Sequence, residues 1–182
     1  ETVWKQAEGY RVPRLAFINK MDRVGADFSM AVASIRERLG ANAVPFQLPI
    51  GAEDTFVGMV DLVRMRAMVW GEDTSLGSKF TETDIPEDLR AEAESARETL
   101  IDALSSEDES IIDAYLAGQE ISAERLLAAA RNGVVACRIF PVFCGSAFKN
   151  KGVQPLLDAV VDLLPSPMEL PAVVGKDPEK PE

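Results

Sequence analysis

Two short apolar runs, far apart in the chain, are each followed by a polar loop and then by an amphipathic segment. The first run covers residues 14–18 and ends at Asn19, and the second covers residues 139–144 and is followed by a loop to Lys151. Such runs are typical of strands buried on both faces, and the succession of strand, loop and helix is typical of parallel sheets. The sequence therefore predicts an α/β fold in which the two strands are adjacent and parallel.

The helices of this α/β unit have clear start and stop signals. Asp27 is placed to cap a helix that runs to Leu39, with Gly40 as its stop. The second helix is expected from Gly152 to Leu164, before a Pro-Ser-Pro sequence. Its predicted inner face consists of Val153, Leu156, Leu157, Val160 and Leu164.

The segment between the two units has a different pattern. Residues 43–50, 56–63, 65–70 and 79–83 are short runs rich in β-formers, separated by glycines that include Gly77, and they predict a small antiparallel sheet. Three helices are expected after it: one from Pro86, one capped by a box of Ser106 and Glu109, and one from Ser122 to Val135. The predicted domains are residues 1–40 and 137–165 as a partial α/β domain, residues 41–136 as an inserted α+β subdomain, and residues 166–182 as a proline-rich linker.

The composition excludes several classes of function. A net charge of −11 disfavours nucleic-acid binding by this segment, because phosphates repel such a field. The chain has no histidine, which excludes a histidine base, and its two cysteines, Cys137 and Cys144, suit buried thiols better than a zinc site. No run approaches the roughly 20 apolar residues that span a bilayer, so no membrane partner is expected.

The loops after the two predicted strands carry the candidate chemistry. Asn19-Lys20-Met21-Asp22 matches the NKxD element of GTP-binding proteins, and Ser146-Ala147 matches their SA element. A carboxylate accepts both the N1–H and the 2-amino donors of guanine, whereas adenine would leave it unpaired, so Asp22 is the predicted specificity residue. The predicted guanine-nucleotide-binding residues are Asn19, Lys20, Met21, Asp22, Ser146, Ala147 and Phe148, with no catalytic residue and no metal ligand.

Each of these residues also has a simple structural role. Lys20 can lay its stem across the base or stand in solvent, and Asp22 can bind the base or cap the following helix. The Asn19 side chain is expected to bond the base edge and the neighbouring loop. The Ala147 N–H is expected to donate to guanine O6, and the Ser146 hydroxyl to brace its loop.

Longer stretches resemble the elongation factor G family of bacterial translational GTPases. Residues 16–23 and 144–154 are similar to it nearly letter for letter, as are residues 39–42, 49–53, 60–63 and 164–167, and the similarity covers about residues 1–171. The resemblance implies a P-loop-type GTPase domain with an inserted subdomain, GTP or GDP as ligand, and magnesium in the intact protein. It also implies a cytoplasmic factor that moves tRNA and mRNA through the ribosome, contacting RNA only indirectly.

The family's phosphate loop, GxxxxGK[ST], its switch threonine and its catalytic histidine have no match in these 182 residues. We therefore expect a piece of a larger GTPase, inactive in hydrolysis by itself. A dinucleotide-dependent oxidoreductase would need GxGxxG opening a helix, which is absent.

The predicted insertion is strongly acidic. Ten carboxylates lie between Glu87 and Asp113, against Arg90 and Arg97. A solvated helix face is the simplest interpretation, and the docking of a basic partner is the alternative. The resemblance implies that residues 41–136 contact the ribosomal stalk protein. An autonomous acidic interaction module within residues 41–136, without nucleotide function, remains a second hypothesis.

Overall fold

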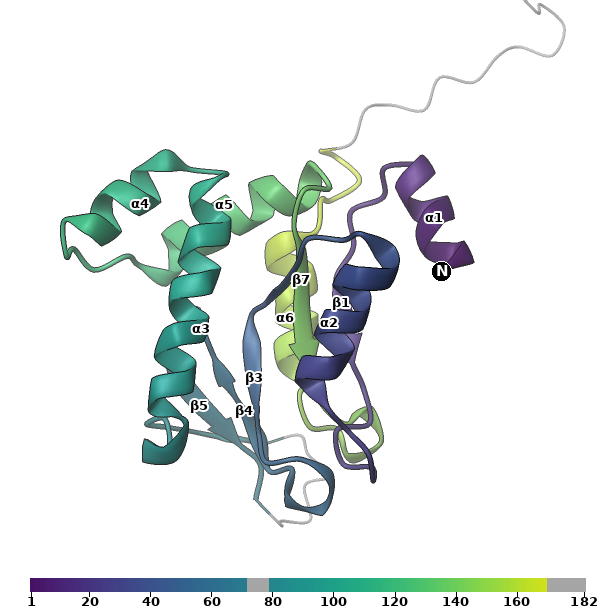
Figure 1. Ribbon diagram of the computed structural model, residues 1–182, viewed down its shortest axis with the longest axis vertical. Helices are drawn as coiled ribbons and strands as arrows, with labels where there is room; N and C mark the ends of the chain where they lie inside the picture. Colours follow the sequence, from purple (N-terminus) through teal and green to yellow (C-terminus); the bar gives the residue numbers. More distant parts are fainter. Residues whose placement is uncertain (72–78, 170–182) are drawn as a thin grey trace, which may run out of the picture.

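The computed structural model describes residues 1–71 and 79–169 as two sheets with helices around them (Figure 1). The helices are α1 Thr2–Gly9, α2 Phe28–Leu39, α3 Glu87–Ser105, α4 Glu109–Leu116, α5 Ala123–Val135 and α6 Val153–Leu163, with short 3₁₀ turns at η1 Glu53–Thr55 and η2 Ala147–Lys149. The strands are β1 Ala16–Ile18, β2 Ala43–Pro45, β3 Gln47–Ile50, β4 Gly58–Asp61, β5 Arg66–Val69, β6 Thr81–Thr83 and β7 Phe140–Cys144.

The parallel sheet has the order β1-β7-β2. Ile18 on β1 is opposite Cys144 on β7, so the two predicted strands are neighbours, parallel and in register at their carboxyl ends. Every residue of β7 is buried, as expected for a central strand covered on both faces. The prediction of adjacent parallel strands is confirmed, and the loops that follow them leave the sheet from the same edge.

One predicted strand is wrong. The run at residues 43–50 was expected to form one strand of the antiparallel sheet, but it is divided between the two sheets at Phe46. The Phe46 N–H donates to the Val142 carbonyl, in the direction of the parallel sheet, at 3.0 Å, and the Phe46 carbonyl accepts from Leu62 N, in the direction of the antiparallel sheet, at 3.0 Å. An apolar run gives no sign of such a change of partner, because strands of the parallel and of the antiparallel sheet are both rich in apolar residues. The domain boundary at residue 41 stays a prediction.

The second sheet is antiparallel, with the order β3-β4-β5-β6. Its core strand β4 pairs along its whole length with both neighbours, Val60 facing Leu48 on β3 and Ala67 on β5. Helices α3, α4 and α5 follow it in sequence and pack on one another, and α5 also packs on α6 and β7. The predicted fold class, an α/β domain with an inserted α+β subdomain, is therefore confirmed. Gly77 lies outside the described residues.

Arg97 of α3 holds the antiparallel sheet to the helices. Its Nη1 donates to the Leu62 carbonyl and, at 2.6 Å, to the Val63 carbonyl, and its Nη2 reaches the Ile121 carbonyl at 3.4 Å. Burial lowers the pKa of the Arg97 guanidinium, and the nearby Asp61 carboxylate offsets part of that effect. One side chain thus satisfies carbonyl groups from two segments that no helix or strand would satisfy.

Most of the predicted helix boundaries are confirmed by their caps. Asp27 accepts from Met30 N at 2.8 Å, and Gly40 closes α2 in the left-handed conformation at φ 62°. Ser122 caps α5. The predicted capping box of Ser106 and Glu109 is wrong: Ser106 has helical backbone angles, which an N-cap residue does not adopt, and Asp108 caps α4 instead.

The predicted inner face of α6 is also wrong in part. Ala159 and Leu163 are its buried residues, whereas Leu157 is 58% exposed and Val160 lies at the surface. Apolar residues occur on several sides of this helix, so the sequence pattern defines no single stripe, and the face that the fold buries is the one with Ala159 and Leu163.

The segment after α6 begins with a turn rather than extended chain. Ser166 N donates to Glu169 Oε2 at 2.6 Å, and Glu169 is paired with Arg131 of α5 at 2.8 Å. The rest of the predicted linker, with Pro171, Pro178 and Pro181, lies outside the described residues. Within the described ranges, no helix has both the length and the apolarity required to cross a bilayer.

Candidate functional site

The two predicted loops are joined by hydrogen bonds across the sheet edge. Gly145 N donates to the Ile18 carbonyl at 3.0 Å, and Met21 N donates to the Gly145 carbonyl at 3.1 Å. A Cβ at Gly145 would collide with the Lys151 carbonyl and the Phe17 ring, so only glycine allows this close approach. These contacts bring residues 19–22 and 146–149 together, as the sequence predicted.

Asn19 is the main link between the loops. Its Oδ1 accepts from Ala147 N at 2.9 Å and from Lys20 N at 2.8 Å, while Lys20 itself has a positive φ of 65°. The Ala147 N–H therefore already has an acceptor. The expected bond from this N–H to guanine O6 would require the Asn19 side chain to share it or to rotate away.

Asp22 lies below the surface of the site. Its side chain is 6% exposed, and Lys149 Nζ is 3.4 Å from its Oδ2. The pKa of Asp22 lies below its ordinary value, because the Ser146 hydroxyl, a backbone N–H and the Lys149 ammonium together outweigh the effect of burial. The carboxylate is thus ionised at neutral pH, which is the form that accepts two hydrogen bonds from a base.

Ser146 and Met21 are buried, whereas Asn19, Lys20, Ala147 and Phe148 are exposed. The Ser146 Oγ makes no hydrogen bond of regular geometry within residues 1–71 and 79–169, although this hydroxyl lowers the pKa of Asp22. Met21 belongs to the hydrophobic core and serves the loop through its backbone. Phe148 is 88% exposed at the rim.

Two further residues shape the site and were not among the predicted ones. Lys149 lies beside the Asp22 carboxylate, where a base would have to meet it. Glu53 supports the first loop from outside: its N–H donates to the Met21 carbonyl at 2.8 Å, and its Oε1 accepts from Gly25 N at 2.7 Å. Glu53 lies in residues 49–53 and Lys149 in residues 144–154, two stretches that resemble the family, but nothing in their spacing indicates these contacts.

Lys149→Ala is expected to raise the pKa of Asp22 toward its ordinary value, because one of the groups that stabilise the carboxylate is removed. The lowered pKa stabilises the folded chain above pH 3.8, the ordinary value, and this contribution disappears as the pH falls through the folded-state pKa. In the variant the folded-state pKa of Asp22 lies closer to 3.8, so the pH range over which this stabilisation is lost should be narrower. Carboxyl ¹³C titration by NMR measures the shift, and Lys5→Ala, a change of the same charge on exposed α1, is the control. An unchanged Asp22 titration would contradict the pairing.

Metal binding has no visible basis in this part of the chain. No three Asp, Glu, Cys or His side chains converge in the described ranges in a way that suits an ion. None of these residues is therefore assigned as a magnesium ligand.

Known proteins were compared with the chain. The profile of the "Elongation factor Tu GTP binding domain" family matches residues 1–166. "Elongation factor G 1" of Bdellovibrio bacteriovorus is 51% identical over 182 residues, which is 100% of this chain and 26% of that protein. A crystal structure of a protein from Thermus thermophilus is similar with a TM-score of 0.77 and 28% identity, over 91% of this chain and 24% of that one. The chain thus spans about a quarter of the length of these two relatives.

Proposed function

The chain belongs to the elongation factor Tu family of GTP-binding domains, the translational GTPases that include elongation factor G, and on this premise we propose that its two joined loops bind the guanine base of GTP or GDP. The observation that carries the proposal is the pairing of Ile18 with Cys144, which puts Asn19 within 2.9 Å of Ala147. Ligands of open parallel sheets bind at this carboxyl edge.

The proposed recognition depends on Asp22. Its ionised carboxylate accepts from guanine N1–H and from the 2-amino group after Lys149 has moved aside, and Lys149 then neutralises charge at the rim. The buried Ser146 Oγ, which lacks a regular partner among the described residues, is available to brace the loop or the ligand. Adenine offers an acceptor where guanine N1 carries a proton, so it would leave a buried carboxylate unpaired.

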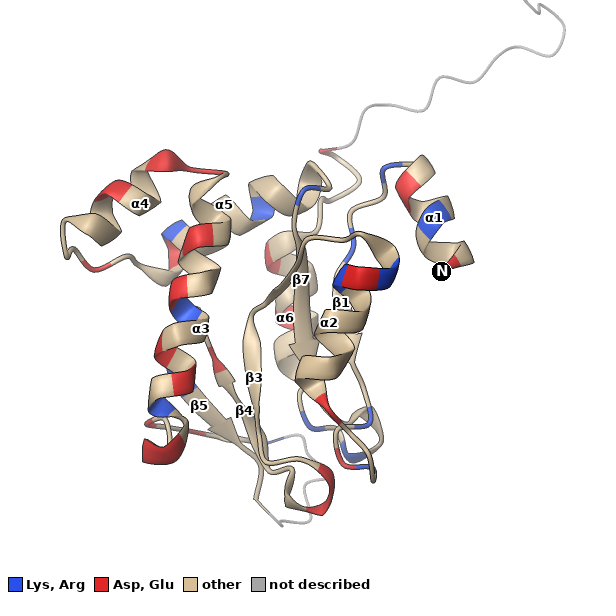
Figure 2. Ribbon diagram, viewed as in Figure 1, with Lys and Arg blue, Asp and Glu red and all other residues tan. Residues whose placement is uncertain are grey.

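The wider role that we propose is that of elongation factor G: a cytoplasmic GTPase that promotes movement of tRNA and mRNA through the ribosome. The inserted subdomain is proposed to dock the ribosomal stalk protein through its acidic helices, α3 and α4, whose ribbons are red at several Asp and Glu positions in Figure 2. Glu107 does not contribute to that surface, because its side chain is 3% exposed and forms an ion pair and hydrogen bonds with Arg138. The exposed carboxylates of α3 are free to steer a basic partner.

The alternative, an autonomous acidic module, has less support. β2 belongs to the parallel sheet, and α3 packs against it. A unit cut at residue 41 would remove β2 from its neighbour β7 and expose their common edge.

Hydrolysis is proposed to need residues outside this chain, because the 182 residues contain neither GxxxxGK[ST] nor histidine. We expect no phosphate release from GTP and magnesium above the rate in buffer. In NMR titrations GDP should shift the amide signals of residues 19–22 and 146–149, while ADP should not. Turnover that elutes with the chain on gel filtration would contradict the first expectation. Equal shifts with ADP, or shifts elsewhere in the chain, would contradict the base site.

A further inference from the structure

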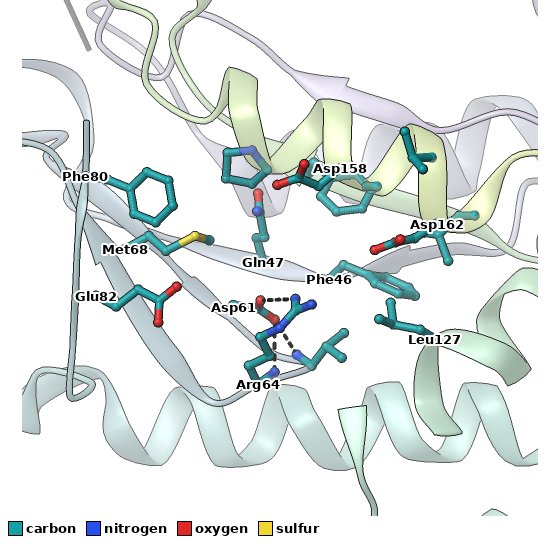
Figure 3. Close-up of a pocket in the computed structure, with 16 residues that line it drawn as sticks. Phe46, Gln47, Asp61, Arg64, Met68, Phe80, Glu82, Leu127, Asp158 and Asp162 are labelled. Atoms are coloured by element: carbon teal, nitrogen blue, oxygen red, sulfur yellow. Dashed lines mark hydrogen bonds and ion pairs between the residues drawn. The ribbon is translucent and has the colours of Figure 1, made fainter. Parts of the chain in front are cut away.

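A pocket of about 410 Å³ lies between the antiparallel sheet and α6 (Figure 3). Its apolar lining includes Phe46, Met68, Phe80, Leu127 and Phe143. The volume is in the range of small-ligand or anchor side-chain sites. None of the loop residues that we assign to the guanine base lines it, so it is a separate site.

The charged groups of this pocket are mostly acidic. Asp61, Glu82, Asp158 and Asp162 line it, and Arg64 is the one basic residue among the described residues of the lining. Arg64 is already paired with Asp61 at 3.1 Å, whereas Glu82, Asp158 and Asp162 have no Lys or Arg at ion-pair distance in residues 1–71 and 79–169. In Figure 3, Glu82 faces the pocket from the sheet, and the two aspartates face it from α6. The pocket therefore places uncompensated negative charge on two sides of an apolar space.

Gln47 adds an independent feature. The residue is 3% exposed, and its Oε1 accepts from Cys144 N at 3.2 Å. That bond holds the Gln47 amide at the wall of the pocket with its Oε1 on Cys144 N, and the NH₂ group is the remaining polar end of this side chain (Figure 3). Within the described residues this NH₂ has no acceptor. A carbonyl of a ligand in the pocket would give this donor a hydrogen-bond partner.

We infer that this pocket binds the side chain of a lysine or arginine, together with a neighbouring main-chain carbonyl, from a basic segment of another polypeptide. The aliphatic stem lies along Phe46 and Met68, the cation meets the carboxylates of α6 and Glu82, and the carbonyl accepts from Gln47. Long basic side chains combine an apolar stem with a charged end in this way, and a guanidinium also interacts well with aromatic faces.

Other ligand classes fit less well. An anion would be repelled by the three unpaired carboxylates. A bare metal ion would find no group of three ligands among the described residues. A free aliphatic polyamine matches the charge but offers no acceptor to Gln47. The net charge of −11 also draws basic partners to the chain from a distance.

The test is an NMR titration of the 182-residue chain, labelled with ¹⁵N and at methionine methyl groups, with the peptide acetyl-Leu-Lys-Leu-amide. Two probes are controls: acetyl-Leu-norleucine-Leu-amide, which lacks the cation, and pentylamine, which lacks the carbonyl. The lysine peptide is expected to shift the Met68 methyl and the Gln47 side-chain NH₂, and to bind roughly several-fold tighter than either control, because one control lacks the ion pairs and the other lacks the hydrogen bond. Equal binding of the norleucine peptide or of pentylamine would overturn the proposal, as would shifts confined to other surfaces.

The double variant Asp158→Asn with Asp162→Asn should weaken the lysine peptide by about tenfold or more. Its matched control, Glu92→Gln with Glu94→Gln on the exposed side of α3, changes the net charge equally away from the pocket and should bind as the parent does. If both double variants lose the same affinity for the lysine peptide, the attraction comes from the net charge of the chain and not from the pocket, and the pocket proposal is wrong. If the α6 variant does not fold, Glu82→Gln on the edge strand gives the same test and should weaken binding several-fold. Because the GDP titration reports on other residues, failure of one proposal leaves the other intact.

Discussion

Replacing Asp22 by asparagine, in a protein that carries this segment together with a complete phosphate-binding half, should shift nucleotide preference from guanine to xanthine. The amide oxygen still accepts from N1–H, but the amide NH₂ opposes the 2-amino donor of guanine and weakens GDP. Xanthine has a 2-oxo group at that position, so the same NH₂ finds an acceptor. The expected change in preference is roughly 2–4 kcal/mol, or about 30- to 700-fold.

The measurement is a competition of xanthosine and guanosine diphosphates against a labelled nucleotide, on the parent and the variant. Asp27→Asn is a matched control: it removes the same charge from a nearby carboxylate that accepts from Met30 N as a helix cap, and asparagine is an equally good cap. The base preference of this control should not change. If Asp22→Asn lowers stability but leaves the preference unchanged, Asp22 has a purely structural role and must be removed from the site.

Arg97→Met is expected to cause the largest loss of stability that we predict, roughly 2–4 kcal/mol in the free energy of unfolding. Methionine retains most of the apolar stem but leaves the carbonyls of Leu62 and Val63 without their donor. Those carbonyls lie where the sheet meets α3, so water replaces the guanidinium poorly.

Urea unfolding followed by circular dichroism measures the effect. Arg90→Met on the same helix is the control, because Arg90 is solvent-exposed and has only an i,i+3 pair with Glu87 at 3.2 Å. It should cost about 0.5 kcal/mol or less. Similar losses for both variants would show that the contribution of Arg97 is only that of a surface charge.

Much of the local structure was predictable because it depends on neighbouring residues. Buried strands appear as continuous apolar runs, and helix ends appear as Asp27, Ser122 and Gly40 at positions where a backbone group needs a cap or a positive φ. The parallel pairing of β1 with β7 also followed from the sequence, since two strand-loop-helix units in one sheet leave few arrangements.

The errors arose where two partners compete for the same residues. Residues 43–50 are apolar in either sheet, and three-dimensional packing alone makes the chain change sheets at Phe46. On α6, residues on several sides are hydrophobic enough to be buried, and only tertiary packing determines that the buried face is the one with Ala159 and Leu163. Sequence periodicity gives the spacing of a face but not the element that will cover it.

The candidate site shows the same division. Residue types and their order along the chain were enough to establish which groups are present to recognise guanine and that their loops follow two parallel strands. Folding was needed to join Asn19 to Ala147, 128 positions away, and to place Lys149 against Asp22. It also produced the pocket between the antiparallel sheet and α6. Hydrogen bonds, ion pairs and cavities depend on distances of a few ångströms between segments far apart in the chain, and neither composition nor spacing records those distances.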